Sequence, residues 1–352
     1  MKYLLVFAVL LATVANVQSG ASVLLSQTPP SVENCCTGFD AADIALTVRI
    51  LAHPALAGRG TGQAGFDVAG LILAQELAQS GFKPLPGSVD GYFQPFTIYN
   101  GTYDRPQSRN VIGYMPGEVA NEYVVIGAHY DHLGVIDDTN DHNGSIANGI
   151  YLGADDNASG TAAVLAVAKA LGKFVEEGNR LRRGVIVGFW GAEELGMLGS
   201  LHFIRSGVVP LDAIVATLNL DMVGRNDPKD LAVVGAETPL DFARASPLLE
   251  FFVREENGKL CEPFAVSYDD QETQYFIRSD GVSFFDARPA GSRIPVLNFT
   301  TLLHDDYHHQ LDTVDKIDEN KIRRIACFSF EVLKRTAQDP RRPRYIEAGL
   351  VP

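Results

Sequence analysis

Five short segments of this sequence carry clusters of imidazole and carboxylate side chains. These groups, without thiolates, suit Zn²⁺, with Mn²⁺ or Co²⁺ as possible substitutes. Taken singly, each cluster has an ordinary explanation, such as a helix N-cap or a charged turn. Five such clusters in one chain are hard to assign to coincidence. They lie at residues 127–134, 153–160, 190–196, 218–224 and 304–312.

The elements expected to position these clusters alternate between strands and helices. Buried runs at Tyr123–Ala128, Gly184–Trp190 and Ala213–Leu220 predict core strands, and each leads directly into a cluster. This alternation predicts an α/β fold in a single domain, with a mainly parallel central sheet and helices on both faces. Because ligands bind beyond the carboxyl ends of such strands, three clusters should meet at one edge.

Apolar periodicity predicts the remaining elements. Helices are expected at Ala41–Leu51, Ala64–Gln79, Ala158–Leu171, Glu194–Arg205, Phe242–Glu256 and Lys316–Gln338, and further strands at Asn110–Met115 and Ile294–Phe299.

Composition excludes several classes of protein. The 352 residues are 46% hydrophobic and 20% charged, which is typical of a folded chain with a substantial core. A formal net charge of −14 argues against a nucleic-acid partner, which requires clustered Lys and Arg. Four cysteines fit no cysteine-based metal motif, and their disulfide connectivity stays open. They are Cys35, Cys36, Cys261 and Cys327.

The N-terminus has the layout of a cleavable signal peptide. Lys2 is followed by an apolar stretch, Tyr3–Ala15, and then by small residues. We therefore expect residues 1–20 to be a signal peptide and residues 21–352 to form the catalytic domain, secreted or periplasmic. No later stretch is expected to be long and apolar enough to span a membrane.

In order along the chain, the clusters resemble a known family. Gly-Ala-His-Tyr-Asp, Gly-Ala-Asp-Asp-Asn-Ala-Ser-Gly, Ala-Glu-Glu-Leu-Gly, Leu-Asp-Met-Val and Tyr-His with a later Asp-Thr are similar to motifs of the zinc exopeptidases. That family includes bacterial leucyl aminopeptidases, glutamate carboxypeptidase and glutaminyl cyclase, and the resemblance covers about Ile50 to Leu333. The chain has no room for the protease-associated domain that some relatives insert.

The resemblance implies a site for two zinc ions. Asp156 would bridge the ions, His129 and Asp221 would bind one of them, and Glu194 and His308 would bind the other. It also implies a cis peptide bond after Asp156.

The resemblance also implies roles for three residues that do not bind metal. Glu193 would be the general base, Asp131 would orient the His129 imidazole, and Tyr307 would donate to the developing oxyanion. Many relatives have Arg-Ser-Asp-His where this chain has Gly281 in place of the histidine. That histidine is not one of the five expected ligands, so its loss affects the expected substrate pocket rather than the metals.

The other histidines are expected away from the metals. His304 and His309 are interpreted as solvated loop residues, and His132, His142 and His202 as surface or structural residues.

The function expected from the resemblance is removal of N-terminal residues from peptide substrates. The same motifs allow a carboxypeptidase or dipeptidase, and then a glutaminyl cyclase-like transferase. A non-catalytic receptor on a peptidase fold is the alternative from another class, although such a protein should have lost a ligand or the base. The sequence does not determine the oligomeric state.

Overall fold

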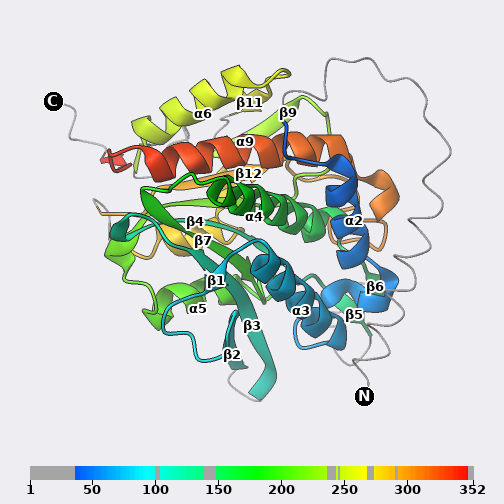
Figure 1. Ribbon diagram of the computed structural model, residues 1–352. Helices are drawn as coiled ribbons and strands as arrows, with labels where there is room; N and C mark the ends of the chain where they lie inside the picture. The colour runs from blue at the N-terminus through cyan, green and yellow to red at the C-terminus, as the bar shows by residue number, and fades with distance from the viewer. Residues whose placement is uncertain are drawn as a thin grey trace.

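A nine-stranded sheet forms the centre of the computed structural model, which describes residues 36–99, 104–137, 148–235, 243–244, 246–267, 273–289 and 292–347 (Figure 1). The expected signal peptide therefore lies outside the described residues. The strands follow the order β1-β3-β7-β4-β8-β12-β9-β11, with β2 paired to β3. They are β1 (Lys83–Pro84), β2 (Phe93–Tyr99), β3 (Asp104–Met115), β4 (Val119–His129), β7 (Arg183–Trp190), β8 (Ile214–Leu220), β9 (Asp230–Val234), β11 (Ala265–Ser267) and β12 (Val296–Thr300).

The middle of this sheet is parallel. Strand β4 pairs in parallel with β7 and β8, and β12 pairs in parallel with β8. Strand β3 runs antiparallel to β7, and β9 runs antiparallel to β12. The predicted parallel centre is confirmed, and the antiparallel flanks are an addition to it. The carboxyl ends of β4, β7, β8 and β12 consequently share one edge of the sheet.

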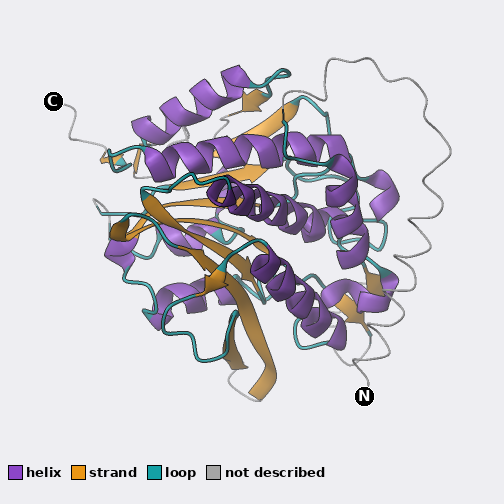
Figure 2. Ribbon diagram, in the orientation of Figure 1, coloured by secondary structure: helices purple, strands orange, loops and turns teal. Residues whose placement is uncertain are grey.

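Helices cover both faces of the sheet (Figures 1 and 2). On one face, α4 and α9 pack against β4, with α2 and α6 against α9; on the other, α5 packs against β3, and α8 against β8 and β12. Strand β4 serves both layers, because Val124 and Ile126 face one core while Val125 faces the other. The helices are α2 (Ala41–Leu51), α3 (Ala64–Gln79), α4 (Gly160–Glu176), α5 (Leu198–Ser206), α6 (Pro247–Lys259), α7 (Thr273–Phe276), α8 (Gly281–Phe285) and α9 (Glu319–Gln338).

Local chemistry explains where several helices begin. Helix α2 begins after Asp40, whose side chain accepts from the Ala42 N–H at 2.8 Å, and α9 begins after Asp318, which caps the Lys321 N–H. The helix expected from Glu194 begins at Leu198 instead, because Met197 has φ 56°, outside the right-handed helical region. The helix expected from Phe242 begins at Pro247, where proline suits the first turn.

The segment that contains α4 differs from the expectation that no stretch after the N-terminus is long and apolar enough to span a membrane. By length and composition alone, residues 154–176 meet the test for a spanning helix, although none was expected after the N-terminus. This segment consists of the turn Ala154–Ser159 and α4, which packs against the centre of the sheet, and 61% of its most apolar window is buried inside the protein. It is therefore a core helix.

Disulfide bonds join distant parts of the chain. Cys36, just before α2, is bonded to Cys327 in α9, and Cys261 is also disulfide-bonded. The connectivity that the sequence left open is thus given in part.

Candidate active site

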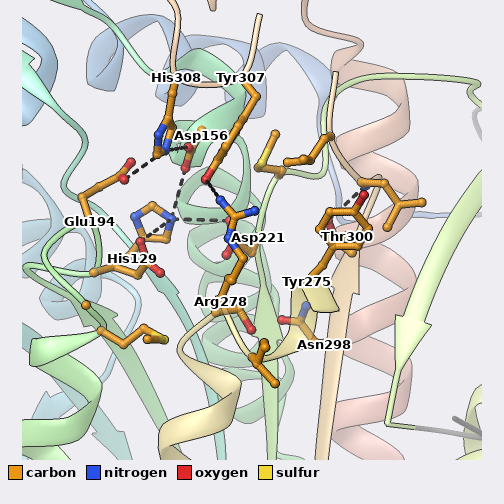
Figure 3. Close-up of a pocket in the computed structure, with 18 residues that line it drawn as sticks. His129, Asp156, Glu194, Asp221, Tyr275, Arg278, Asn298, Thr300, Tyr307 and His308 are labelled. Carbon is orange, nitrogen blue, oxygen red and sulfur yellow. Dashed lines mark hydrogen bonds and ion pairs between the residues drawn. The ribbon is translucent and has the colours of Figure 1, made fainter. Parts of the chain in front are cut away.

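The predicted site residues meet at the carboxyl edge of the parallel strands. His129 is the last residue of β4, and Asp221 directly follows β8. Glu193 and Glu194 lie in the turn after β7, and Asp156 lies in the irregular turn Ala154–Ser159 before α4. With His308, from the loop after β12, all six line one pocket of about 250 Å³ (Figure 3).

Asp156 lies between the two histidines. Its Oδ1 is 3.3 Å from Nε2 of His129, and its Oδ2 is 3.3 Å from Nε2 of His308. Asp221 Oδ1 is 3.4 Å from the same nitrogen of His129, and Glu194 Oε2 is 3.0 Å from that of His308. One carboxylate therefore faces two separate groups of ligand atoms. The peptide bond after Asp156 is cis, as the resemblance implied.

These atoms suit divalent cations. The nearest ligand atoms of His129, Asp156 and Asp221 all lie within 4.8 Å of one another. Nε2 of His308 is buried and, among the described residues, has no hydrogen-bond partner, although two carboxylates lie beside it. Imidazole and carboxylate donors without cysteine form a fitting set for zinc. The residues present therefore fit two metal ions that share Asp156.

The site residues also interact strongly with one another. Burial would raise the pKa of Asp156, but the nearby imidazoles of His129 and His308 hold it well below its usual range. Burial, aided by the negative charge of Glu194, raises the pKa of Glu193 well above that of an ordinary glutamate, although His129 opposes the shift. Bound cations would add their own charge to this balance.

Asp131 supports both His129 and Glu193. Its backbone carbonyl lies 3.2 Å from Nδ1 of His129, while its carboxylate is 3.8 Å from that nitrogen. The carboxylate instead accepts from the Glu193 N–H at 3.1 Å and from the Thr61 hydroxyl at 3.0 Å. Asp131 thus contacts the imidazole through its carbonyl and holds the backbone of Glu193 through its side chain.

Tyr307 projects into the pocket beside His308, with their rings stacked at 3.9 Å (Figure 3). Arg278, which also lines the pocket, donates to the Tyr307 hydroxyl at 2.9 Å. Because the hydroxyl oxygen accepts this bond, its own hydrogen can point elsewhere. Burial raises the pKa of Tyr307, which keeps the phenol protonated.

Two histidines differ from the sequence interpretation. His132 is not at the surface, since it is buried with Nδ1 2.7 Å from Glu194 Oε1 and 3.7 Å from Asp156 Oδ2. Its nearest ligand atom forms a compact group with those two carboxylates, so it is a further candidate ligand. His304 is not solvated either, because its side chain is 4% exposed and lies 3.3 Å from Asp155. His309 is exposed, as expected, and His142 lies outside the described residues.

Sequence reasoning missed the groups that hold the site loops. Arg59 is fully buried and donates to the carbonyls of Leu51, Tyr130, Leu152 and Gly153 at 2.6–2.9 Å. It therefore ties the segment after His129 to the segment before Asp156. The only available signal was its place in a turn-rich segment, which indicates a loop but not a buried cation.

Asp312 was also missed as a supporting residue. Its carboxylate accepts from the backbone N–H groups of Asp155 and Asp156 at 2.9–3.0 Å. Burial, together with the charge of Asp155, raises its pKa to about 6. The loop that carries His308 is thereby fixed to the turn that carries Asp156.

The fold and the paired ligand groups define a class: hydrolases that bind metal ions at the carboxyl edge of an open α/β sheet. The Peptidase family M28 model matches residues 110–333, so the chain belongs to peptidase family M28. The resemblance drawn from the motifs is confirmed.

Individual relatives agree with this assignment. A probable lipoprotein aminopeptidase, LpqL, of Mycobacterium tuberculosis is 34% identical over 145 residues, which is 41% of this chain and 25% of that protein. The chain thus matches about a quarter of the length of this relative.

Solved structures show the same fold. A zinc aminopeptidase from Bacillus subtilis has a TM-score of 0.64 at 17% identity, covering 86% of this chain and 96% of that one. A Porphyromonas gingivalis glutaminyl cyclase has a TM-score of 0.61 at 20% identity, covering 84% of this chain and 98% of that one.

Proposed function

We propose that the protein is a secreted exopeptidase that uses two zinc ions to remove N-terminal residues from peptides. The observation that carries the proposal is the position of Asp156, whose two oxygens face His129 and His308 separately. Secretion rests on the composition of residues 1–20 alone.

In this proposal, His129 and Asp221 bind one ion, Glu194 and His308 bind the other, and Asp156 bridges them. His132 is close enough to Glu194 and Asp156 to bind or to orient the second set. Zinc held there would supply Lewis acidity, lowering the pKa of a water toward about 7 and polarising the scissile carbonyl.

The chain's own residues move the protons. Glu193 lies beside the ligand groups, with Oε2 4.0 Å from Nε2 of His129, and its carboxylate lines the pocket. It would take a proton from the attacking water and return it to the leaving amine. Tyr307 would donate its hydroxyl hydrogen to the carbonyl oxygen as negative charge develops, with Arg278 fixing the phenol.

The pocket favours a small substrate terminus. A volume of about 250 Å³ suits one residue rather than an extended peptide, and Met197, Met222 and Leu303 give it apolar walls. The carboxylates of Glu193 and Asp221 can attract an α-ammonium group. The resemblance to a probable aminopeptidase supports this choice of terminus.

Arg278 favours a second candidate. Its guanidinium lines the same pocket and could bind a substrate carboxylate, as a carboxypeptidase or dipeptidase requires. The five ligands and Glu193 are all present, which counts against a non-catalytic receptor.

A substrate panel with metal analysis tests the proposal. Aminoacyl chromogenic substrates, their N-acetylated analogues, free dipeptides and a peptide with N-terminal Gln would be offered to the metal-loaded protein. We expect two zinc ions per chain, cleavage of the free aminoacyl substrates and no cleavage of the acetylated ones. Cleavage confined to substrates with a free C-terminal carboxylate would establish the second candidate, and cyclisation without cleavage would indicate a transferase. A protein that binds no metal would refute the proposal.

A further inference from the structure

A second cavity lies at the opposite edge of the sheet. Its volume is about 320 Å³, and its walls come from the start of β8, from the segment between α8 and β12, and from the segment after α9. At about 3.3 Å per residue, the seven residues of β8 separate it from Asp221 by about 23 Å. It is therefore separate from the metal site.

Arginine dominates the lining of this cavity. Arg288, Arg293, Arg342 and Arg344 all line it, whereas the lining includes a single carboxylate, that of Asp212. The chain as a whole has a formal net charge of −14. The cavity is therefore positively charged in a protein that is negatively charged overall. Four guanidinium groups around one cavity create a local excess of positive charge.

The nearby acids neutralise this charge only weakly. Arg288 lies 2.8 Å from Asp212, but the Asp212 side chain is 99% exposed to water. Arg293 lies 3.7 Å from Asp286, which is also mostly exposed. Because the carboxylates of both pairs are solvated, these ion pairs contribute little. Within the described residues, Arg344 forms no ion pair or hydrogen bond.

One donor group remains free to bind a ligand. Nε of Arg293 is buried and, in the described part of the chain, has no hydrogen-bond acceptor, whereas Nη2 of Arg288 is held by the exposed Asp212 carboxylate. Buried donors without acceptors are rare in folded proteins and ask for an explanation. An oxyanion in the cavity would provide the acceptor that Nε of Arg293 lacks, because guanidinium groups bind planar or tetrahedral oxyanions through paired N–H bonds.

The walls of the cavity are fixed in place. Arg342 donates to the backbone carbonyls of Asp212 and Ile214, which ties the C-terminal segment to the start of β8. The Tyr345 hydroxyl accepts from the Val296 N–H at 2.9 Å, which ties the same segment to β12. The guanidinium of Arg293 lies 4.0 Å from the centre of the Phe285 ring. Groups held in this way need little reorganisation to bind a ligand.

We propose that this arginine cavity is a binding site for a small dianion that carries two oxyanion groups. Phosphate, sulfate and carboxylate groups share the required chemistry. At about 320 Å³ the cavity is at the lower end of the range for small-molecule sites, about 300–1,000 Å³, and has room for more than one such group. The proposal does not depend on the peptidase mechanism.

Calorimetric titration of the metal-loaded protein at low ionic strength tests the site. The probes are ethane-1,2-disulfonate and succinate, which carry equal charge on different oxyanions. For one of them we expect one-to-one binding with a Kd below about 1 mM, weakened by added salt. The preferred probe identifies the ligand as a sulfate or phosphate type or as a dicarboxylate.

Paired variants locate the binding. The Arg293→Gln/Arg344→Gln variant removes two guanidinium groups of the cavity but leaves Arg342 to hold the C-terminal segment. It should bind at least about tenfold more weakly. The Arg180→Gln/Arg205→Gln variant removes the same charge from exposed positions outside the cavity and should change Kd by less than about twofold. Absence of saturable binding by the unaltered protein, or equal weakening in both variants, would overturn the proposal.

Discussion

The residues that line the candidate metal pocket and the residues directly behind them use polar groups in opposite ways. In the pocket, the side-chain atoms face one another, and Nε2 of His308 lies beside Asp156 and Glu194 without a hydrogen-bond partner among the described residues. Behind it, Arg59 donates to four backbone carbonyls, and Asp312 accepts from two backbone N–H groups.

Asn157 shows how close the two layers lie. It follows Asp156 directly, yet its side chain donates to the Leu220 carbonyl and accepts from the N–H groups of Gly160 and Met222. The difference teaches that one layer is built to bind a ligand and the other to hold the first in place. Substitutions in the pocket should therefore change metal binding and rate, whereas substitutions behind it should first change stability.

Asp156→Ala should have the largest effect. Because Asp156 faces both sets of ligands, its loss should reduce the bound zinc from two ions to none and abolish hydrolysis. Elemental analysis after dialysis measures the metal, and Asp305→Ala, an exposed carboxylate in the His308 loop, serves as the control. If the variant kept both zinc ions, Asp156 would not be the residue that bridges them.

Glu193→Gln should lower the catalytic rate without changing metal binding. The amide keeps the shape of the side chain but cannot take a proton, so kcat should fall by about 10²–10⁴-fold. Metal content and the free energy of unfolding should stay unchanged, because no expected ligand is removed. Steady-state kinetics and elemental analysis on the same preparation check this. Loss of zinc in the variant would instead identify Glu193 as a ligand.

Arg59→Met should separate stability from chemistry. The change leaves four carbonyls without their buried donor, and we expect the free energy of unfolding to fall by about 3–5 kcal/mol. Denaturant titration measures the loss, with Arg49→Met on the exposed face of α2 as the control, expected within about 0.5 kcal/mol. If Arg59→Met were as stable as the control, the residues behind the pocket would not have the stabilising role proposed for them.

The sequence predicted the pocket better than the layer behind it. His129, Asp221 and the Glu193 turn follow buried strands, so alternation of strands and helices was enough to bring them to one edge. The expected helices Ala41–Leu51 and Ala64–Gln79 are confirmed to the residue, because their apolar spacing coincides with their boundaries.

What the sequence did not predict depends on contacts between distant residues. Arg59 and Leu152 are 93 positions apart, and Asp312 and Asp155 are 157 apart. No local sequence pattern can therefore predict either contact. For His132 the sequence left a surface and a structural position open, because a histidine three residues after a strand end has the same local pattern whether it faces water or Glu194. The arginine cavity was missed for the same reason, since it combines three separate segments.

Asp312→Asn should have the smallest effect and tests both layers together. An asparagine offers one acceptor oxygen where Asp312 offers two, and its amide hydrogens oppose the N–H groups of Asp155 and Asp156. We expect a loss of about 1–3 kcal/mol in the free energy of unfolding. Because the same N–H groups fix the turn that carries Asp156, zinc affinity should also fall by about 10–100-fold.

Competition with a zinc-binding dye measures that affinity, and Asp305→Asn provides an exposed control in the same loop. Reduced stability with unchanged zinc affinity would mean that the two layers act independently. Reduced zinc affinity with an unchanged free energy of unfolding would mean that Asp312 acts as the pocket residues do. A fall in both would show that the backbone N–H groups behind Asp156 transmit the support on which its position depends.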